Sequence, residues 1–215
     1  MQRSNATGRS TATMPIGIAD LADATRAAVA ALDSPLVASF LAEWPQRPRT
    51  RRVEPRTLPV LRCLATIAEA AVADTGPQVV RDLVAAVLRS AGEMAWRQTY
   101  TQQESSADFL DNYGYAELLG LNGPQWSERL AAGFLLLGAD TFYPRHRHAA
   151  EELYLPLYGR ADWQQGDTVW RAREPGTLIH HRSEEPHAMR TGANPLLALY
   201  LWRGADLALK SRLGE

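Results

Sequence analysis

The sequence predicts an α+β protein in which a mainly helical N-terminal region is followed by an antiparallel β-barrel. Residues 16–126 are dominated by stretches rich in Ala and Leu at helical spacing, whereas residues 127–205 hold short apolar or alternating runs separated by Gly, Pro, Asp and Asn. Five or more short strands in about 80 residues are typical of a small antiparallel barrel or sandwich. No internal repeat is visible, so we expect one compact unit that ends in a tail over residues 206–215.

The N-terminal elements follow from spacing and from residues that stop helices. Residues 1–15 are small and polar without an apolar core region, which indicates a disordered start rather than a signal peptide. Helices are expected within residues 17–35, 58–74 and 78–96, the first two ending at Pro35 and at Thr75-Gly76-Pro77. In the first helix the buried stripe runs through Ile18, Leu21, Thr25, Ala28 and Leu32.

The connections and strands are read in the same way. The charged, Pro-broken residues 45–56 are expected to be a solvated loop. From 100 to 124 the periodicity fades, and we expect a packed loop that contains Tyr113 and Tyr115. Strands are then expected within residues 131–140, 151–167, 177–182, 186–191 and 195–204.

Composition excludes several classes of function. The net charge is −1 and no basic stripe suggests a nucleic-acid partner. No apolar run approaches the roughly 20 residues that span a bilayer, so the expected location is the cytoplasm. Cys63 is the single cysteine, which excludes an intrachain disulfide and a zinc site rich in thiolates.

The five histidines lie within residues 146–187, and their spacing suggests a metal site. His146, His148, Glu152 and Tyr154 have equal parity, so on one extended strand they would share a face, unless a turn at residues 149–150 interrupts it. Two imidazoles and a carboxylate form most of a site for a divalent transition metal. A third histidine from another strand would complete it, and His187 is the candidate.

The same residues resemble the two motifs of the cupin family, which implies a double-stranded β-helix, or jelly-roll, barrel. The first motif, H-x-H-x3-E-x6-G, matches His146, His148, Glu152 and Gly159, and the second runs from Gly176 to His187. Departures fall on turn positions of the motifs and on none of the ligand positions: Asp140, Arg182, Glu184 and Thr191.

Within the cupins, YPRHRHAAEELY, PHAMRT and ALYLWRG look like the dimethylsulfoniopropionate lyases, which carry a helical region before the barrel. The resemblance implies one divalent metal held by the residues His146, His148, Glu152 and His187. It implies that Tyr154 is the catalytic base. Tyr143 would line the pocket and assist catalysis, and Trp202 would bind substrate.

The chemistry of that family requires residues of these kinds. Dimethylsulfoniopropionate yields dimethyl sulfide and acrylate by β-elimination, which removes a weakly acidic proton beside a carboxylate. A metal on that carboxylate stabilises the developing charge, and zinc, iron, manganese, cobalt or nickel would suit the ligands. A phenol beside a cation ionises more easily than its usual pKa of about 10 suggests. The sulfonium is attracted to aromatic faces such as that of Trp202.

Other interpretations stay open. Tyr154 could simply pack in the barrel wall, Tyr200 is expected to be core, and His180 and His181 are expected to be structural. A cupin dioxygenase, an isomerase acting on another small carboxylate, and a metabolite-binding cupin without activity are alternatives. The leucine face of residues 153–157 needs a cover, which helices, a second sheet or a partner subunit could supply, and a homodimer is expected.

Overall fold

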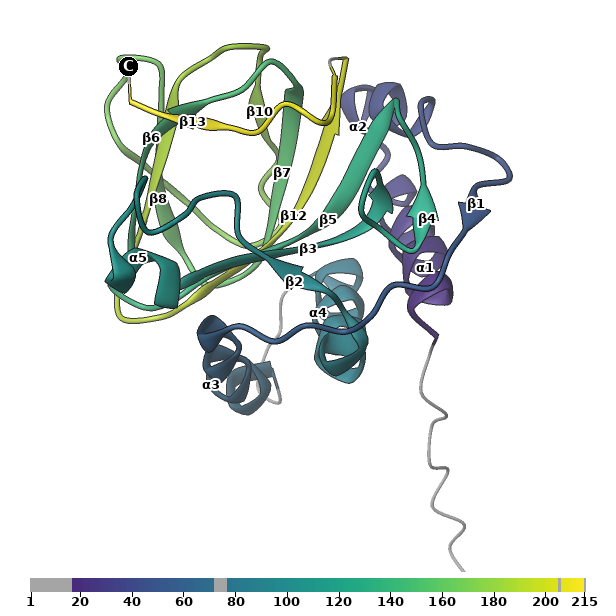
Figure 1. Cartoon of the computed structure of the whole chain (residues 1–215), viewed down its shortest axis with the longest axis horizontal. Coiled ribbons are helices and arrows are strands. Elements are labelled where there is room, and N and C mark those ends of the chain that lie inside the picture. Colours follow the sequence, from purple (N-terminus) through teal and green to yellow (C-terminus); the bar gives the residue numbers. More distant parts are fainter. Residues whose placement is uncertain (1–16, 72–76, 205, 215) are drawn as a thin grey trace, which may run out of the picture.

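The computed structural model describes residues 17–71, 77–204 and 206–214 (Figure 1). The expectation of a disordered start over residues 1–15 lies outside this range. The described strands form two sheets that face each other, with helices packed on the outside of the larger one. The α+β class is therefore confirmed, although hydrogen bonding among the described strands leaves two separate sheets rather than one closed barrel.

The large sheet has the strand order β1-β4-β3-β5-β12-β7-β10, and β2 pairs with β3 at its side. All described pairings in it are antiparallel except that of β3 with β4. Its strands are β1 (Arg49–Thr50), β2 (Trp96–Arg97), β3 (Tyr113–Gly120), β4 (Gln125–Trp126), β5 (Leu130–Leu137), β7 (Glu151–Tyr158), β10 (Ile179–His181) and β12 (Leu196–Arg203).

The small sheet has the order β13-β6-β11-β8-β9 and is antiparallel throughout its described pairings. Its strands are β6 (Phe142–Arg147), β8 (Ala161–Gln165), β9 (Arg171–Arg173), β11 (His187–Thr191) and β13 (Arg212–Leu213). Because β6 and β8 belong to this sheet while β5 and β7 belong to the large one, the chain alternates between the sheets as it runs from 130 to 165.

The helices lie on the side of the large sheet away from the small sheet, with the exception of α5 at the sheet end (Figure 1). They are α1 (Ile18–Ala30), α2 (Pro35–Leu41), α3 (Cys63–Ala71), α4 (Gln78–Ser90) and α5 (Ala107–Asp111), with single 3-10 turns η1 (Pro59–Arg62) and η2 (Ala91–Glu93). No helix among the described residues is long and apolar enough to cross a membrane.

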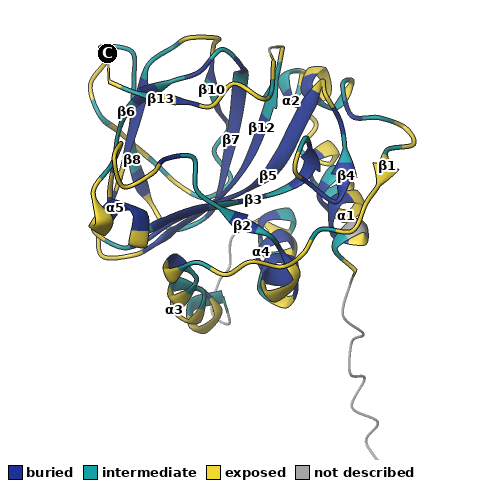
Figure 2. Ribbon diagram, in the orientation of Figure 1, coloured by how far each residue is buried: buried dark blue, intermediate teal, exposed yellow. Residues whose placement is uncertain are grey.

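Two cores follow from the alternation of side chains along the strands. Leu153, Leu155 and Leu157 of β7 point outward and pack in one cluster with the apolar face of α4, for example with Leu83 and Val87. The strands are buried along most of their length, whereas the helices expose their outer faces (Figure 2). The helices therefore cover the leucine face, and no partner subunit is needed for that purpose.

The second core lies between the two sheets and is rich in aromatic side chains. Tyr143 and Trp163 of the small sheet meet Tyr113, Tyr154 and Tyr200 of the large sheet in one buried cluster. Tyrosine carries a polar hydroxyl at the end of an apolar ring. This interior can therefore line a cavity as well as pack.

The structure departs from the sequence expectations at several elements. Ser34 and Pro35, expected to stop the first helix, also begin α2, because the Ser34 hydroxyl accepts a hydrogen bond from Val37 N–H at 3.5 Å and Pro suits the first helical position. The helix expected to reach Trp96 ends at Ser90, since Trp96 pairs with Ala116 in the sheet. Residues 100–124, expected to be a loop, contain α5 and the eight-residue strand β3.

Candidate metal centre

The predicted ligands come from both sheets, which corrects the expectation that residues 146–154 form one strand. His146 lies on β6 and His148 follows it, whereas Glu152 and Tyr154 lie on β7 of the other sheet. The anticipated interruption at residues 149–150 is where the chain crosses between sheets. Equal parity still holds within β7, where Glu152 and Tyr154 face the interior and the intervening leucine faces the helices.

Strand pairing brings His187 to the same place. It begins β11 and is the Cα partner of His146, while Glu152 is opposite Trp202 on β12 and His181 on β10. The short segment between β6 and β7 then carries His148 across the gap between the sheets. Residues that are up to 41 positions apart in sequence thus converge because His146, Glu152 and His187 lie near the ends of strands, and His148 lies in the connection between two of them.

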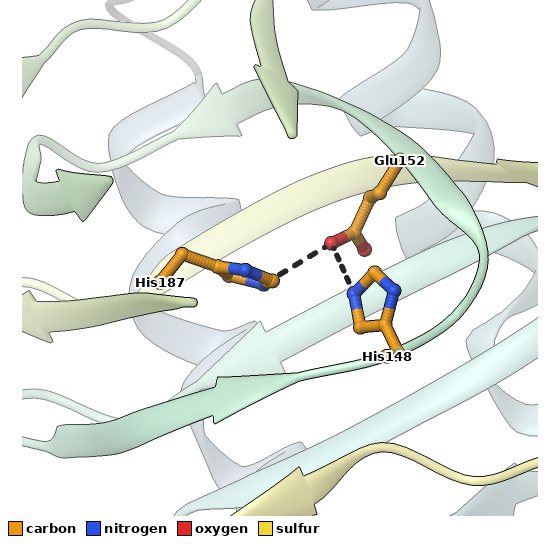
Figure 3. A group of neighbouring side chains, drawn as sticks. All are labelled: His148, Glu152 and His187. Carbon is orange, nitrogen blue, oxygen red and sulfur yellow. Dashed lines mark hydrogen bonds and ion pairs between the residues drawn. The ribbon is translucent and has the colours of Figure 1, made fainter. Parts of the chain in front are cut away.

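Three of the four predicted ligands form a compact buried group (Figure 3). One nitrogen each of His148 and His187 and one oxygen of Glu152 lie within 4.8 Å of one another. Glu152 Oε2 is 2.9 Å from His148 Nε2 and 3.3 Å from His187 Nε2. All three side chains are almost entirely inaccessible to solvent.

Backbone hydrogen bonds set the tautomer of the predicted histidine ligands. The Nδ1 atoms of His146, His148 and His187 lie 2.8, 2.8 and 2.9 Å from the carbonyl oxygens of Pro144, Ala150 and Glu185. A carbonyl oxygen only accepts, so each Nδ1 must carry the hydrogen and donate. In the neutral ring, Nε2 then has a lone pair that can bind a metal. A hydrogen bond from the other ring nitrogen, here Nδ1, is the usual way in which a metal-binding histidine is oriented.

The negative carboxylate of Glu152 and the lone pairs of the two imidazoles would be stabilised by a positive charge placed between them. Burial raises the pKa of Glu152, but His148 and His187 outweigh it and hold that pKa well below the usual range. Burial lowers the pKa of His148, and the ionised Glu152 beside it raises it overall. Two Nε2 lone pairs directed at one carboxylate oxygen repel it unless protons or a cation lie between them. The donor set therefore fits a divalent transition metal.

His146, the fourth predicted ligand, borders this group. Its ring lies 4.1 Å from that of His187 and is stacked on Tyr143 at 4.0 Å with a 9° interplanar angle. Burial and the neighbouring His187 hold its pKa well below the usual range, so the imidazole is neutral near pH 7. The structure thus places His146 beside the three grouped ligands but outside the set that lies within 4.8 Å.

A cavity of about 210 Å³ opens next to the group. The other predicted site residues, Tyr143, Tyr154 and Trp202, line it together with His146 and Glu152. The Trp202 indole N–H donates a hydrogen bond to Glu152 Oε1, and its ring lies 4.1 Å from that of His148. Trp202 therefore both contacts the ligand group and faces the cavity.

Sequence reasoning missed several residues that line the cavity. Tyr200, expected only as core, is buried and also faces the cavity. Tyr113, Tyr115 and Glu117 face it from β3, and residues 207–211 also line it. In YGYAE, Tyr113, Tyr115 and Glu117 alternate with smaller residues, which is the spacing of a strand. The strand was missed because two tyrosines and a glutamate do not resemble the apolar face of a buried strand.

The two remaining histidines have different surroundings. His180, expected to be structural, forms a hydrogen bond of 2.6 Å with Glu151 near the surface. His181 is fully buried and stacked on His187 at 3.9 Å, and among the described residues its Nε2 has no hydrogen-bond partner. Its ring therefore packs against that of His187, one of the predicted ligands.

Comparisons with known proteins identify the family of the chain. The family model described as dimethylsulfoniopropionate lyase matches residues 35–198. The dimethylsulfoniopropionate lyase DddQ of Ruegeria pomeroyi is 38% identical over 142 residues, which cover 64% of this chain and 71% of that protein.

Two solved structures extend the likeness to nearly the whole chain. One, from the crystal structures of the dimethylsulfoniopropionate lyases RdDddP and RnDddQII, has a TM-score of 0.78 at 31% identity, covering 92% of this chain and 97% of that one. The structure of DddQ from Ruegeria pomeroyi has a TM-score of 0.70 at 31% identity, covering 90% and 99%. The chain therefore belongs to the dimethylsulfoniopropionate lyase family, and it is a carbon–sulfur lyase.

Proposed function

We propose that this protein cleaves dimethylsulfoniopropionate to dimethyl sulfide and acrylate in a metal-dependent β-elimination. The observation that carries the proposal is the buried group of His148, Glu152 and His187, with its Nε2 atoms directed inward, at the wall of an aromatic cavity. The family assignment supports the substrate.

His148, Glu152 and His187 would hold the metal, and His146 is the proposed fourth ligand by its place in the motif. A bound divalent cation supplies positive charge that stabilises negative charge on the substrate carboxylate and favours ionisation of a neighbouring phenol. The backbone acceptors of the three Nδ1 atoms keep the ligands oriented. The three grouped side chains are almost inaccessible to solvent, so electrostatic interactions among them are stronger than in water.

Tyr154 is the proposed base, and its position explains why it needs a cation. Burial, followed by the charge of Glu152, raises the pKa of this phenol well above 10. In its phenolate form it removes the proton on the carbon next to the carboxylate. The electron pair of that C–H bond becomes the new C=C bond, and the C–S bond breaks with its electrons leaving on neutral dimethyl sulfide.

Tyr143 and Trp202 position the substrate in this proposal. Tyr143 is held by a hydrogen bond of 3.1 Å to Tyr100 and is stacked on His146, so its ring forms a fixed wall beside the ligands. Trp202 presents an aromatic surface to the sulfonium, an attraction worth roughly 0.5–2 kcal/mol.

The direct test is the release of dimethyl sulfide into headspace from purified protein under anaerobic conditions. We expect release that stops after chelation, returns when manganese, iron or zinc is restored, and is abolished in Tyr154→Phe. Tyr158→Phe is the matched control, because Tyr158 lies at the end of the same strand and packs against the helix-side core.

Each alternative function gives a different result in this assay. An absolute need for oxygen would indicate a dioxygenase. Metal binding without release would leave a cupin that binds or isomerises another small carboxylate. Release that is unchanged in Tyr154→Phe would refute the proposed base while leaving the substrate in place.

A further inference from the structure

The cavity continues away from the metal ligands to a second polar end at Glu117. The strand register places Glu117 of β3 opposite Gly133 of β5, Gly133 opposite Tyr200 of β12, and Tyr200 opposite Tyr154 of β7. Neighbouring strands are about 4.8 Å apart, so Glu117 lies roughly 14 Å from Tyr154 along one row across the sheet. Both residues line the same cavity.

Gly133 allows the Tyr200 phenol to lie across β5 in the direction of β3. A Cβ atom at Gly133 would be 2.1 Å from the carbonyl oxygen of Ala116 and 2.8 Å from the Tyr200 hydroxyl. No residue with a side chain fits there. Tyr200 can therefore cover the floor of the cavity between the metal centre and Glu117.

Aromatic rings surround this end of the cavity. Tyr115, two residues before Glu117 on the same face of β3, meets Tyr200 edge to face with ring centres 6.3 Å apart. Tyr200 meets Trp202 in the same way at 6.3 Å. The three rings form a continuous aromatic wall from Glu117 back to the ligand group.

No cationic side chain of the described residues forms an ion pair with the Glu117 carboxylate. Its Oε1 accepts hydrogen bonds from the backbone N–H groups of Asn122 and Gly123. Among the described residues, Oε2 makes no hydrogen bond and no cationic side chain lies within 4.0 Å. Burial raises the pKa of Glu117 against the opposing effects of the two backbone donors and the more distant Arg97 and Arg51. A cation in the cavity would compensate the charge.

We propose that Glu117, with the rings of Tyr115 and Tyr200, forms a negative end of the cavity that attracts the cationic head group of the substrate and selects for it. The inference rests on the proposed function, because the metal centre fixes where the substrate carboxylate lies. A zwitterion with an onium group two carbons from a carboxylate is much shorter than this row of roughly 14 Å, so its onium group lies beside Trp202 and Tyr200, and Glu117 attracts it across the cavity. A neutral molecule of the same shape leaves Glu117 desolvated without a partner and binds less well.

The test compares two inert ligands of equal shape that differ in one charge. They are the trimethylammonium betaine of β-alanine and its carbon isostere, 4,4-dimethylpentanoate, titrated calorimetrically into the metal-loaded protein. We expect the wild type to prefer the betaine by about tenfold or more. Glu117→Gln should reduce this preference at least fivefold, since about 1 kcal/mol is lost with the charge, and should leave the affinity for the isostere within about twofold.

Glu117→Gln retains an oxygen that can accept from Asn122 and Gly123, so the turn after β3 should persist. The matched control is Glu128→Gln, which removes the same charge from an exposed position. If Glu117→Gln fails to fold, Tyr115→Leu serves in its place and should also reduce the preference. Equal affinity of the wild type for the two ligands, or a preference unchanged in the variants, would overturn the inference.

Turnover separates this inference from the proposed function. Glu117→Gln should raise the KM for dimethylsulfoniopropionate more than it lowers kcat, because the charge acts on binding rather than on the proton transfer. If the wild type releases no dimethyl sulfide but keeps a preference that depends on Glu117, the cation-binding end stands and the lyase proposal falls. If the wild type releases dimethyl sulfide but shows no preference that depends on Glu117, the lyase proposal stands and the cation-binding end falls.

Discussion

At the scale of single residues, Trp202 both donates a hydrogen bond to Glu152 and lines the cavity. Its indole N–H is a hydrogen-bond donor to Glu152 Oε1, and the other carboxylate oxygen faces the two histidines. Outer partners of this kind orient a ligand and keep its charge in place. Removal of the donor should loosen Glu152 without creating a large void.

We expect Trp202→Phe to weaken metal binding by roughly 10–100-fold, the usual effect of losing such a partner. Trp163→Phe is the control, since Trp163 is buried between the same sheets and, among the described residues, its indole N–H has no partner. Competition with a chromophoric chelator measures both affinities. Equal losses in the two variants would show that the effect is one of packing and would contradict the role assigned to the hydrogen bond.

At the scale of elements, the turns that connect the sheets depend on specific glycines. Gly159, which ends the first motif, has a φ of +80° between β7 and β8, and a Cβ there would be 2.0 Å from the carbonyl oxygen of Pro195. Gly166, after β8, has a φ of +52° but open space around it. Both positions disfavour a side chain, but only the first also forbids it sterically.

Gly159→Ala should therefore destabilise the protein by more than about 3 kcal/mol, whereas Gly166→Ala should cost only about 1–2 kcal/mol for the left-handed backbone. Urea unfolding followed by circular dichroism measures both. Similar midpoints for the two variants would mean that the turn after β7 can move away from Pro195.

The C-terminal segment lines the cavity and makes two ion pairs, Lys210 with Glu104 and Arg212 with Glu184. Residues 207–211 line the cavity, and β13 pairs with β6 beside His146. Lys210, the single lysine of the chain, contacts Glu104 from the segment that precedes α5. The hydrogen bond from Lys210 is the leading cause of a lowered pKa at Glu104.

A protease that cleaves after lysine can report the opening of this segment at a single site. Glu104→Gln should be cleaved several-fold faster than wild type at pH 8, and salt should accelerate cleavage of the wild type because exposed ion pairs are screened. Glu93→Gln, an exposed change elsewhere, is the control. Unchanged cleavage in Glu104→Gln would show that the ion pair does not hold the segment.

The same ion pair predicts a dependence on pH. Because the folded-state pKa of Glu104 is depressed, its contribution is present above the unfolded pKa and is lost as the pH falls through the folded pKa. Amide protection of residues 207–210, the part of the segment that Lys210 anchors, should be lower at pH 4 than at pH 7 after correction for intrinsic exchange. In Glu104→Gln the two values should agree, and a difference of wild-type size there would point to another titrating group.

At the scale of the whole molecule, the proposed metal joins the two sheets. His148 and His187 belong to the small-sheet side and Glu152 to the large sheet. A metal that binds the folded chain at 100 times its Kd adds about 2.7 kcal/mol to the free energy of unfolding. Chelation should then lower Tm by about 5–10 °C for a chain of this length.

Calorimetry of the metal-loaded and chelated protein measures this shift. Glu152→Gln should have a low Tm that chelation does not change further, because it lacks the carboxylate on which both histidines converge. A shift of the same size in Glu152→Gln would place the stabilising metal at another site.

The sequence pattern alone predicted features that depend only on local helix or strand geometry and not on which segments pack together. Helical spacing predicted the buried face of α1 around Leu21 and Thr25, and parity predicted that Glu152 and Tyr154 face away from Leu153 and Leu155. Motif spacing also predicted three residues that the structure brings together, His148, Glu152 and His187. Each of these inferences depends on the local geometry of a helix or strand, or on a spacing that a family retains.

The other features of the fold and the site depend on which strands pair, and that pairing is decided by residues far apart in the sequence. The crossing from β6 to β7 at residues 148–151, the place of β3 beside β5 and the position of Glu117 in the cavity follow from pairings between segments far apart in the chain. A strand with tyrosine and glutamate on one face looks like a loop until the opposite sheet supplies the aromatic surroundings that bury it. Local spacing fixes the direction of a side chain, but the register between strands fixes what that side chain meets.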